Sequence, residues 1–149
     1  MSGVDFDLII YHLFKIGVAF MLTLPMAVNR EKKSDSAGLR TFPLVTIACC
    51  AFALVGIDVF EQGDAQARVV YGVITGIGFI GGGAIYKCDR HIEGTATAAG
   101  IWLTGAIGIS VAYSRYEIAI VLSLTSYCVF KLLEHYKIKP QPVQGGDHV

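Results

Sequence analysis

The chain has 149 residues, of which 54% are hydrophobic and 16% are charged, and its twelve basic residues balance twelve acidic ones. An ordinary soluble domain carries about 25% charged residues, so the composition excludes that class, and the hydrophobic content excludes a disordered chain. The balanced charge provides no basic surface for nucleic acid, and the length fits one domain. We therefore predict an integral membrane protein that does not bind nucleic acid.

Five apolar stretches are long enough, or nearly so, to cross a bilayer, whose core of about 30 Å needs roughly 20 helical residues. They cover about 8–28, 41–60, 68–86, 95–113 and 116–133. No alternation of period two is present, so a β-barrel is not expected. The fold class that we predict is all-α, a bundle of five transmembrane helices within residues 1–139, followed by a disordered tail at 140–149.

The first stretch is expected to remain in the protein as an anchor. The residues that lead into it include Asp5 and Asp7 but no Lys or Arg. A secretory signal peptide begins with basic residues, so a cleaved leader is not expected.

The basic residues predict the orientation of the spans, because cytoplasmic loops carry an excess of Lys and Arg. On one side of the predicted bundle lie nine of them: Arg30, Lys32, Lys33, Arg40, Lys87, Arg90, Lys131, Lys137 and Lys139. The other side has only Arg68 and Arg115. We therefore expect the N-terminus outside and the C-terminus in the cytoplasm.

The cysteines and histidines form no pattern that predicts a bound metal. Cys49 and Cys50 are adjacent within one apolar stretch and Cys128 lies in another, which is typical of buried thiols. The histidines are scattered and form no zinc-type spacing with the cysteines. No nucleophile stands at a useful distance from a base either, so we expect no cofactor and no enzymatic activity.

Small residues recur at helical spacing in the third and fourth stretches. They are Gly72, Gly76, Gly78 and Gly82 in the third, and Gly100, Thr104 and Gly108 in the fourth. Helices in lipid approach one another through such residues, so we predict that these two helices pack closely together. The alternative is that the glycines let a substrate or partner approach the backbone.

Three segments resemble the motifs of a known family. The first is Arg30-Glu31 followed by Ala37-Gly38-Leu39-Arg40-Thr41, and the second is Arg68 followed by the glycine-rich run from Thr75 to Ile85. The third contains Gly94, then Thr97-Ala98-Ala99, then Ile101-Trp102-Leu103. In this order they resemble the N-terminal membrane domain of the MgtC/SapB family, in a short form without the soluble C-terminal domain.

The resemblance implies a function that composition alone does not. The family is associated with bacterial adaptation to low magnesium and with virulence, and some members are proposed to restrain the proton-driven ATP synthase by contact within the membrane. We therefore expect a multi-pass protein of the bacterial inner membrane that regulates a membrane partner, the ATP synthase being one candidate. The alternatives are a transporter or channel subunit for Mg²⁺ or another ion, which could form its pore as a homo-oligomer, and a structural subunit of a larger complex.

The best candidate site is on the predicted cytoplasmic face. Arg30, Glu31, Arg40 and Thr41 come from one loop, and Thr97 follows another loop on the same side. These polar groups could bind a partner or an ion. The alternative is that the charges only fix the topology and connect the two loops.

Two further features are weaker candidates. Lys15 lies about 12 Å into its span, at a rise of 1.5 Å per residue. A charge at that depth is either functional or belongs to a side chain that snorkels outward, toward Asp58. Asp58 and Asp64 lie on the outer side and could bind Mg²⁺, which uses one or two carboxylates. Acidic residues are also ordinary in an exposed outer loop.

Overall fold

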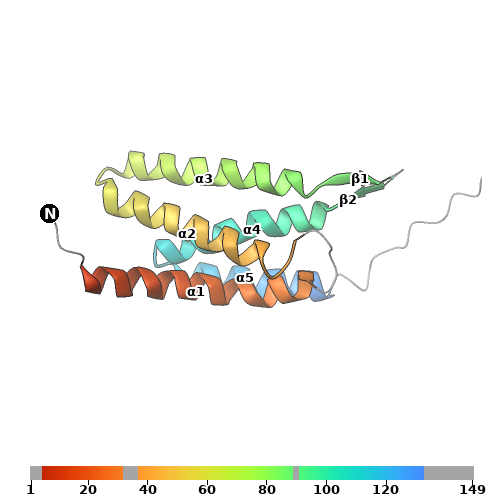
Figure 1. Cartoon of the computed structure of the whole chain (residues 1–149), viewed down its shortest axis with the longest axis horizontal. Helices are drawn as coiled ribbons and strands as arrows, with labels where there is room; N and C mark the ends of the chain where they lie inside the picture. The colour runs from red at the N-terminus through yellow and green to blue at the C-terminus, as the bar shows by residue number, and fades with distance from the viewer. Residues whose placement is uncertain (1–4, 32–36, 89–90, 133–149) are drawn as a thin grey trace, which may run out of the picture.

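The computed structural model describes residues 5–31, 37–88 and 91–132, which form five helices and a short hairpin (Figure 1). In chain order they are α1 (Phe6–Glu31), α2 (Thr41–Val59), α3 (Gly63–Gly83), β1 (Tyr86–Cys88), β2 (His91–Glu93), α4 (Thr95–Ala112) and α5 (Tyr116–Leu132). The helices lie side by side along the long axis of the molecule. The hairpin marks one end of the bundle, which we call the hairpin end, and the turns from α2 to α3 and from α4 to α5 lie at the opposite end.

The ends of α1 follow from local chemistry. The Oδ1 atom of Asp5 accepts hydrogen bonds from the backbone N–H groups of Asp7 and Leu8, at 3.0 and 3.4 Å. An acidic residue in the first turn and Arg30 in the last turn both interact favourably with the helix dipole. The helix therefore extends beyond the predicted apolar stretch at both ends.

The prediction for the third stretch, 68–86, is wrong at both ends. The helix begins at Gly63, because Asp64 in the first turn is favourable for a helix although it interrupts an apolar run. It ends within a run of glycines, which are poor helix formers, and the chain then forms the hairpin, in which Tyr86 pairs with Glu93. Gly94 closes the hairpin with a φ of 84°, and a Cβ atom there would collide with the carbonyl oxygen of Ala84.

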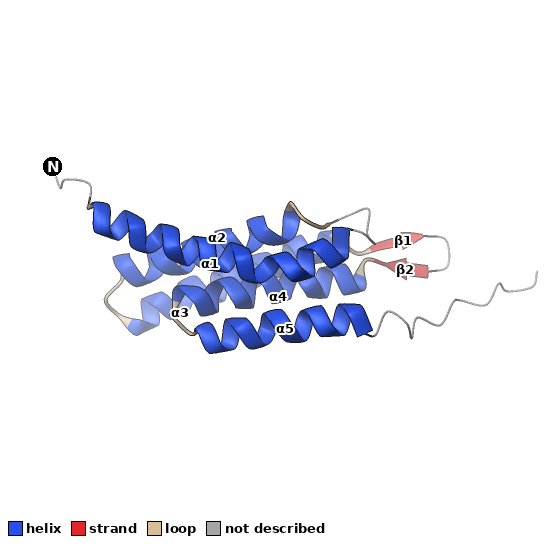
Figure 2. Cartoon of the chain, turned by 90° about the horizontal axis from the view of Figure 1, so that it is seen from below, coloured by secondary structure: helices blue, strands red, loops and turns tan. Residues whose placement is uncertain are grey.

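Helix α4 occupies the centre of the bundle and packs against all four other helices (Figure 2). Buried apolar side chains form two clusters along it. One cluster includes Ala19, Cys50, Leu54, Ile107, Val111 and Ala119, and the other includes Met26, Phe42, Cys49, Ile77 and Ile101. Helix α3 lies at the edge, against α2 and α4, and Ile77 is its one buried side chain.

Helix α3 does pack against α4, but the four glycines of α3 that were predicted to make this contact do not make it. A Cβ atom added at Gly72, Gly76, Gly78 or Gly82 would meet nothing within 4 Å. Helix α3 instead approaches α4 at Gly81, where an added Cβ would lie 3.1 Å from the carbonyl oxygen of Ala98. The spacing of small residues defines a face of a helix, but it does not tell which neighbour, if any, lies opposite that face.

The small residues of α4 are at a close helix contact, but mainly with α2. A Cβ atom added at Gly100 would lie 2.7 Å from a ring atom of Phe42, and one added at Gly108 would lie 3.0 Å from the backbone nitrogen of Cys50. Thr104, between them, is fully buried. This ladder therefore brings α4 and α2 together at the centre of the bundle.

Hydrogen bonds between buried hydroxyl groups and neighbouring helices add to this packing. Thr23 of α1 and Thr46 of α2 lie 2.8 Å apart at their hydroxyl oxygens. On α5, Ser123 donates to the carbonyl oxygen of Leu22 at 2.5 Å. Small polar side chains of this kind are common between helices in lipid.

The outer surface of the bundle is apolar. Large side chains are exposed on every helix, among them Phe14, Phe52, Phe79, Trp102 and Leu124. Within the described residues, α1, α2 and α4 are long and apolar enough to cross a membrane. This supports a membrane protein, while the full five-span layout and its orientation stay predictions, and the predicted tail at 140–149 lies outside the described residues.

Candidate functional site

The structure joins two of the predicted site residues at the hairpin end. Arg30, in the last turn of α1, donates a hydrogen bond from Nη2 to the hydroxyl oxygen of Thr97 in the first turn of α4, at 2.7 Å. The two residues are 67 positions apart. They meet because α1 ends and α4 begins at the same end of the bundle (Figure 1).

The guanidinium group of Arg30 is held in a partly apolar setting. It lies over the ring of Phe130 on α5, with 5.0 Å between the guanidinium carbon and the ring centroid. A cation over an aromatic face is stabilised by the ring's charge distribution. Arg30 thereby links α1, α4 and α5.

Two polar atoms in this region have no hydrogen-bond partner among the described residues. They are Nε of Arg30, a donor, and Oδ1 of Asn29, an acceptor, and both are shielded from solvent. Buried polar atoms are nearly always paired in folded proteins. The site therefore combines a fixed cation with two polar atoms that the described residues leave unpaired.

The first turn of α4 adds further donors next to this cation. Gly94 precedes the helix and provides no side-chain cap. The first N–H groups of a helix lack intrahelical partners and favour negative charge. Thr97 is buried, so its hydrogen bond with Arg30 lies beneath the surface of the bundle.

The other predicted members of the site lie close in sequence but have different contacts. Glu31 accepts a hydrogen bond from the backbone N–H of Leu39 at 2.7 Å, and thus fixes the start of α2. Arg40 is exposed just before α2 and Thr41 is the half-buried first residue of that helix. The part of the chain that the structure describes shows no hydrogen bond between either of them and Arg30.

The weak metal candidates Asp58 and Asp64 lie toward the opposite end of the bundle. Asp58 pairs with His12 of α1, with 2.9 Å between Oδ2 and Nε2, although the angles are outside those of a hydrogen bond. Asp64 is exposed in the first turn of α3. Among the described residues, no group of three or more His, Cys, Asp or Glu side chains could hold a metal ion.

The expectation that Lys15 snorkels toward Asp58 is wrong. Its side chain is 1% exposed, and Nζ donates to the carbonyl oxygen of Ala112 at 2.6 Å and to the hydroxyl oxygen of Ser114 at 2.8 Å. Because the C-terminal carbonyls of a helix carry partial negative charge, the ammonium caps α4. A cap 97 positions away gives no local signal in the sequence.

The prediction that the thiols are buried holds for two of the cysteines and fails for a third. Cys49 and Cys50 are buried in the two apolar clusters, whereas Cys128 is exposed on α5. Membership of an apolar stretch predicted burial for all three, but a residue on the outer face of a membrane helix contacts lipid instead.

Comparison with known proteins identifies similar sequences across most of the chain. Residues 16–138 match the profile of the MgtC family. The chain is 32% identical over 114 residues to "Putative magnesium transporter YhiD" of Escherichia coli K12, which covers 72% of this chain and 53% of that protein. It is 32% identical over 141 residues to "Protein SrpB" of Synechococcus elongatus, covering 80% of this chain and 78% of that protein.

A third relative carries the family's name. The chain is 26% identical over 136 residues to "Protein MgtC" of Salmonella choleraesuis, covering 90% of this chain and 58% of that protein. The chain thus spans about half the length of two of these three relatives. No solved structure matches it.

Proposed function

Because the matching profile covers most of its length, the chain belongs to the MgtC family, and from this premise we propose that it is a non-enzymatic regulator in the bacterial inner membrane. It acts by contact with another membrane protein during adaptation to magnesium limitation or to a host. In this proposal all five helices cross the membrane, with the N-terminus outside and the hairpin end in the cytoplasm. The ATP synthase, which the family resemblance implies, is the first partner to test.

The placement of charge in the helices is the observation that carries this proposal over transport. Each carboxylate of the described helices lies in a terminal turn: Asp7, Glu31, Asp58, Asp64 and Glu117. The one fully buried charged side chain of the described residues is Lys15, a cation. A divalent ion inside the bundle would meet an ammonium group and no carboxylate.

The energetics of a buried ion explain why the lack of carboxylates inside the bundle argues against transport. Moving an isolated ion from water into an apolar interior costs on the order of tens of kcal/mol by Born estimates. Channels and transporters compensate with carboxylates or with free carbonyl groups that line a cavity. Backbone carbonyls within continuous helices already accept hydrogen bonds, so this chain alone offers little compensation.

The surface that we assign to partner contact is the site at the hairpin end. Arg30 is fixed there by Thr97 and Phe130, and the site keeps a donor and an acceptor that the described residues do not satisfy. Arg30 as a whole is only half-buried, so the accessible part of its fixed guanidinium group can bind a carboxylate or backbone carbonyl of a partner at little cost in side-chain entropy.

Transport of Mg²⁺ is the competing proposal, because one relative is named a putative magnesium transporter. On that alternative a homo-oligomer would have to supply the pore. Asp58 and Asp64 at the opposite end would then be the first residues to attract the ion.

Reconstitution separates the two proposals. We expect the purified chain in liposomes to give no saturable Mg²⁺ flux. A saturable flux that Asp58→Asn or Asp64→Asn abolishes would refute the regulator and establish the transporter.

Co-purification in mild detergent tests the contact surface. We expect Arg30→Gln to lose the membrane partner while the protein itself remains folded and abundant. The matched control is Arg115→Gln, because Arg115 is an exposed arginine at the opposite end of the bundle. A partner retained equally by both variants would remove Arg30 from the contact surface.

A further inference from the structure

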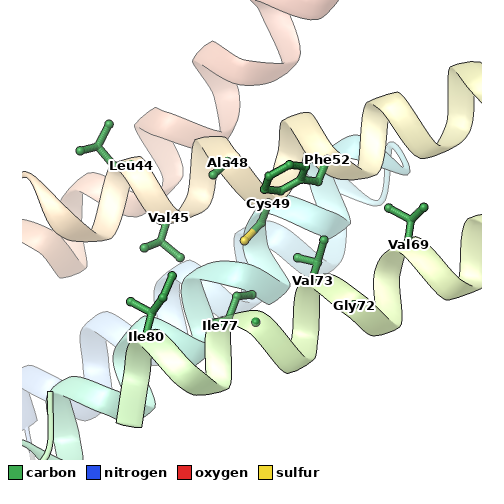
Figure 3. A pocket seen from close by; sticks show the side chains of 11 residues that line it. Leu44, Val45, Ala48, Cys49, Phe52, Val69, Gly72, Val73, Ile77 and Ile80 are labelled. Carbon is green, nitrogen blue, oxygen red and sulfur yellow. The ribbon is translucent and has the colours of Figure 1, made fainter. Parts of the chain in front are cut away.

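A groove of about 550 Å³ runs between α2 and α3 on the outer surface of the bundle (Figure 3). Its walls include Leu44 and Phe52 of α2 and Val69 and Ile80 of α3. All of its lining residues are apolar or glycine apart from the thiol of Cys49.

The groove exists because α3 has glycines where side chains would fill it. Gly72 and Gly76 lie one helical turn apart and both line the groove. A Cβ atom at either would meet nothing within 4 Å. The space is therefore open, whereas Gly100 and Gly108 of α4 are covered by α2.

The length and the apolar lining of the groove suit a hydrocarbon chain. Leu44 and Phe52 are eight residues apart, which corresponds to a length of about 12 Å along α2. A lipid acyl chain is a single file of methylene groups, and its apolar surface matches this lining.

The charges at one end of the groove indicate which lipid it takes. Arg40 is exposed one turn before Leu44, on the same face of α2. Lys87 is exposed on β1, at the same end of the bundle. In the proposed membrane placement, cations at this end of the bundle would lie at the level of the lipid headgroups, and they favour anionic headgroups.

We propose that the groove between α2 and α3 binds an acyl chain of one anionic phospholipid, whose phosphate is held by Arg40. This inference rests on the membrane placement in the proposed function but not on the choice between regulator and transporter. Bound in this way, the lipid would form part of the surface that α2 and α3 present to a partner.

Native mass spectrometry of the purified full chain tests the proposal, with phosphatidylglycerol and phosphatidylcholine of identical acyl chains as probes. We expect one phosphatidylglycerol to remain bound at collision energies that remove phosphatidylcholine. Gly76→Leu should reduce its retention at least tenfold, because the leucine fills the groove. Ala48→Leu, which fills the same groove from α2, should do the same.

Matched variants separate this effect from general damage. Gly78→Leu adds the same side chain to α3 at another open position that does not line the groove, so it should retain the lipid. Arg40→Gln should bring the two lipids to equal retention, whereas Arg68→Gln, an exposed arginine toward the opposite end of α3, should leave the preference intact.

Three results would overturn the inference. One is retention of phosphatidylglycerol by both folded groove-filling variants, and another is an unchanged preference in Arg40→Gln. The third is a dimer of the wild-type chain that Gly76→Leu dissociates without loss of lipid, which would assign the groove to a second copy. None of these would alter the flux or co-purification results that test the proposed function.

Discussion

Replacing Gly108 by alanine should separate the two helices at the centre of the bundle. The added Cβ atom would collide with the carbonyl oxygen of Thr46 and would lie 3.0 Å from the backbone nitrogen of Cys50. Both are backbone atoms of α2, so no side chain can rotate away and α2 itself must shift. Overpacking of this kind costs about 1–3 kcal/mol, and we expect the upper part of that range.

A matched substitution on α3 shows how much of the effect comes from the contact. At Gly78 an added Cβ atom meets nothing within 4 Å, and alanine is favoured over glycine in a helix by up to about 1 kcal/mol. Gly78→Ala should therefore be neutral or slightly stabilising. The two variants make the same chemical change, so the gain in helix propensity cancels and they should differ by the overpacking cost at Gly108 alone, about 2–3 kcal/mol.

Thermal unfolding in mild detergent, followed by size-exclusion chromatography of a fluorescent fusion, measures the difference. For a chain of this size 1 kcal/mol corresponds to about 2–4 °C in Tm, so Gly108→Ala should melt roughly 5–10 °C below Gly78→Ala. Equal melting temperatures would show that α2 and α4 do not meet at Gly108, and would refute the packing described for α4.

Three further predictions concern other parts of the chain. Gly94→Ala should lower the Tm by several degrees, since it places a side chain at positive φ at a cost of about 1–2 kcal/mol and against a carbonyl oxygen; an unchanged Tm would contradict the geometry of the turn. In a Cys88→Ser background, N-ethylmaleimide should label Cys128 alone in the folded detergent-solubilised protein and all three remaining thiols after denaturation, as counted by mass. Reporter fusions should place Gln141 in the cytoplasm and Gly63 outside, and an outside signal at Gln141 would overturn the five-span layout or its direction.

The apolar stretches located the helices well, because a span needs a minimum length of apolar chain whatever it packs against. The predicted 41–60 and 95–113 agree within one residue at each end with Thr41–Val59 and Thr95–Ala112. The hairpin was missed because strands of three residues are too short to show alternation. Charged residues such as Asp64 limited a predicted stretch although they stabilise the end of a helix.

Contacts between distant segments were harder to predict than the segments themselves. The positive-inside rule placed the loops before α2 and before α4 on the same side, and this was enough to group Arg30 with Thr97. The cap that Lys15 forms on α4 depends on how the helices are rotated about their axes. The same rotations decide which glycines are covered, and the periodicity of one helix contains no information about the orientation of its neighbour.

The single buried side chain of α3 has a consequence for the shape of the bundle. Ile77 inserts against α4 at Gly105, where an added Cβ atom would collide with it. Residues 60–62 connect α2 to α3, and the hairpin joins α3 to α4. Ile77 therefore acts as a spacer between α3 and α4 in the second half of α3, so a smaller or larger side chain at this position would narrow or widen the lipid-facing gap beside α2 at this level.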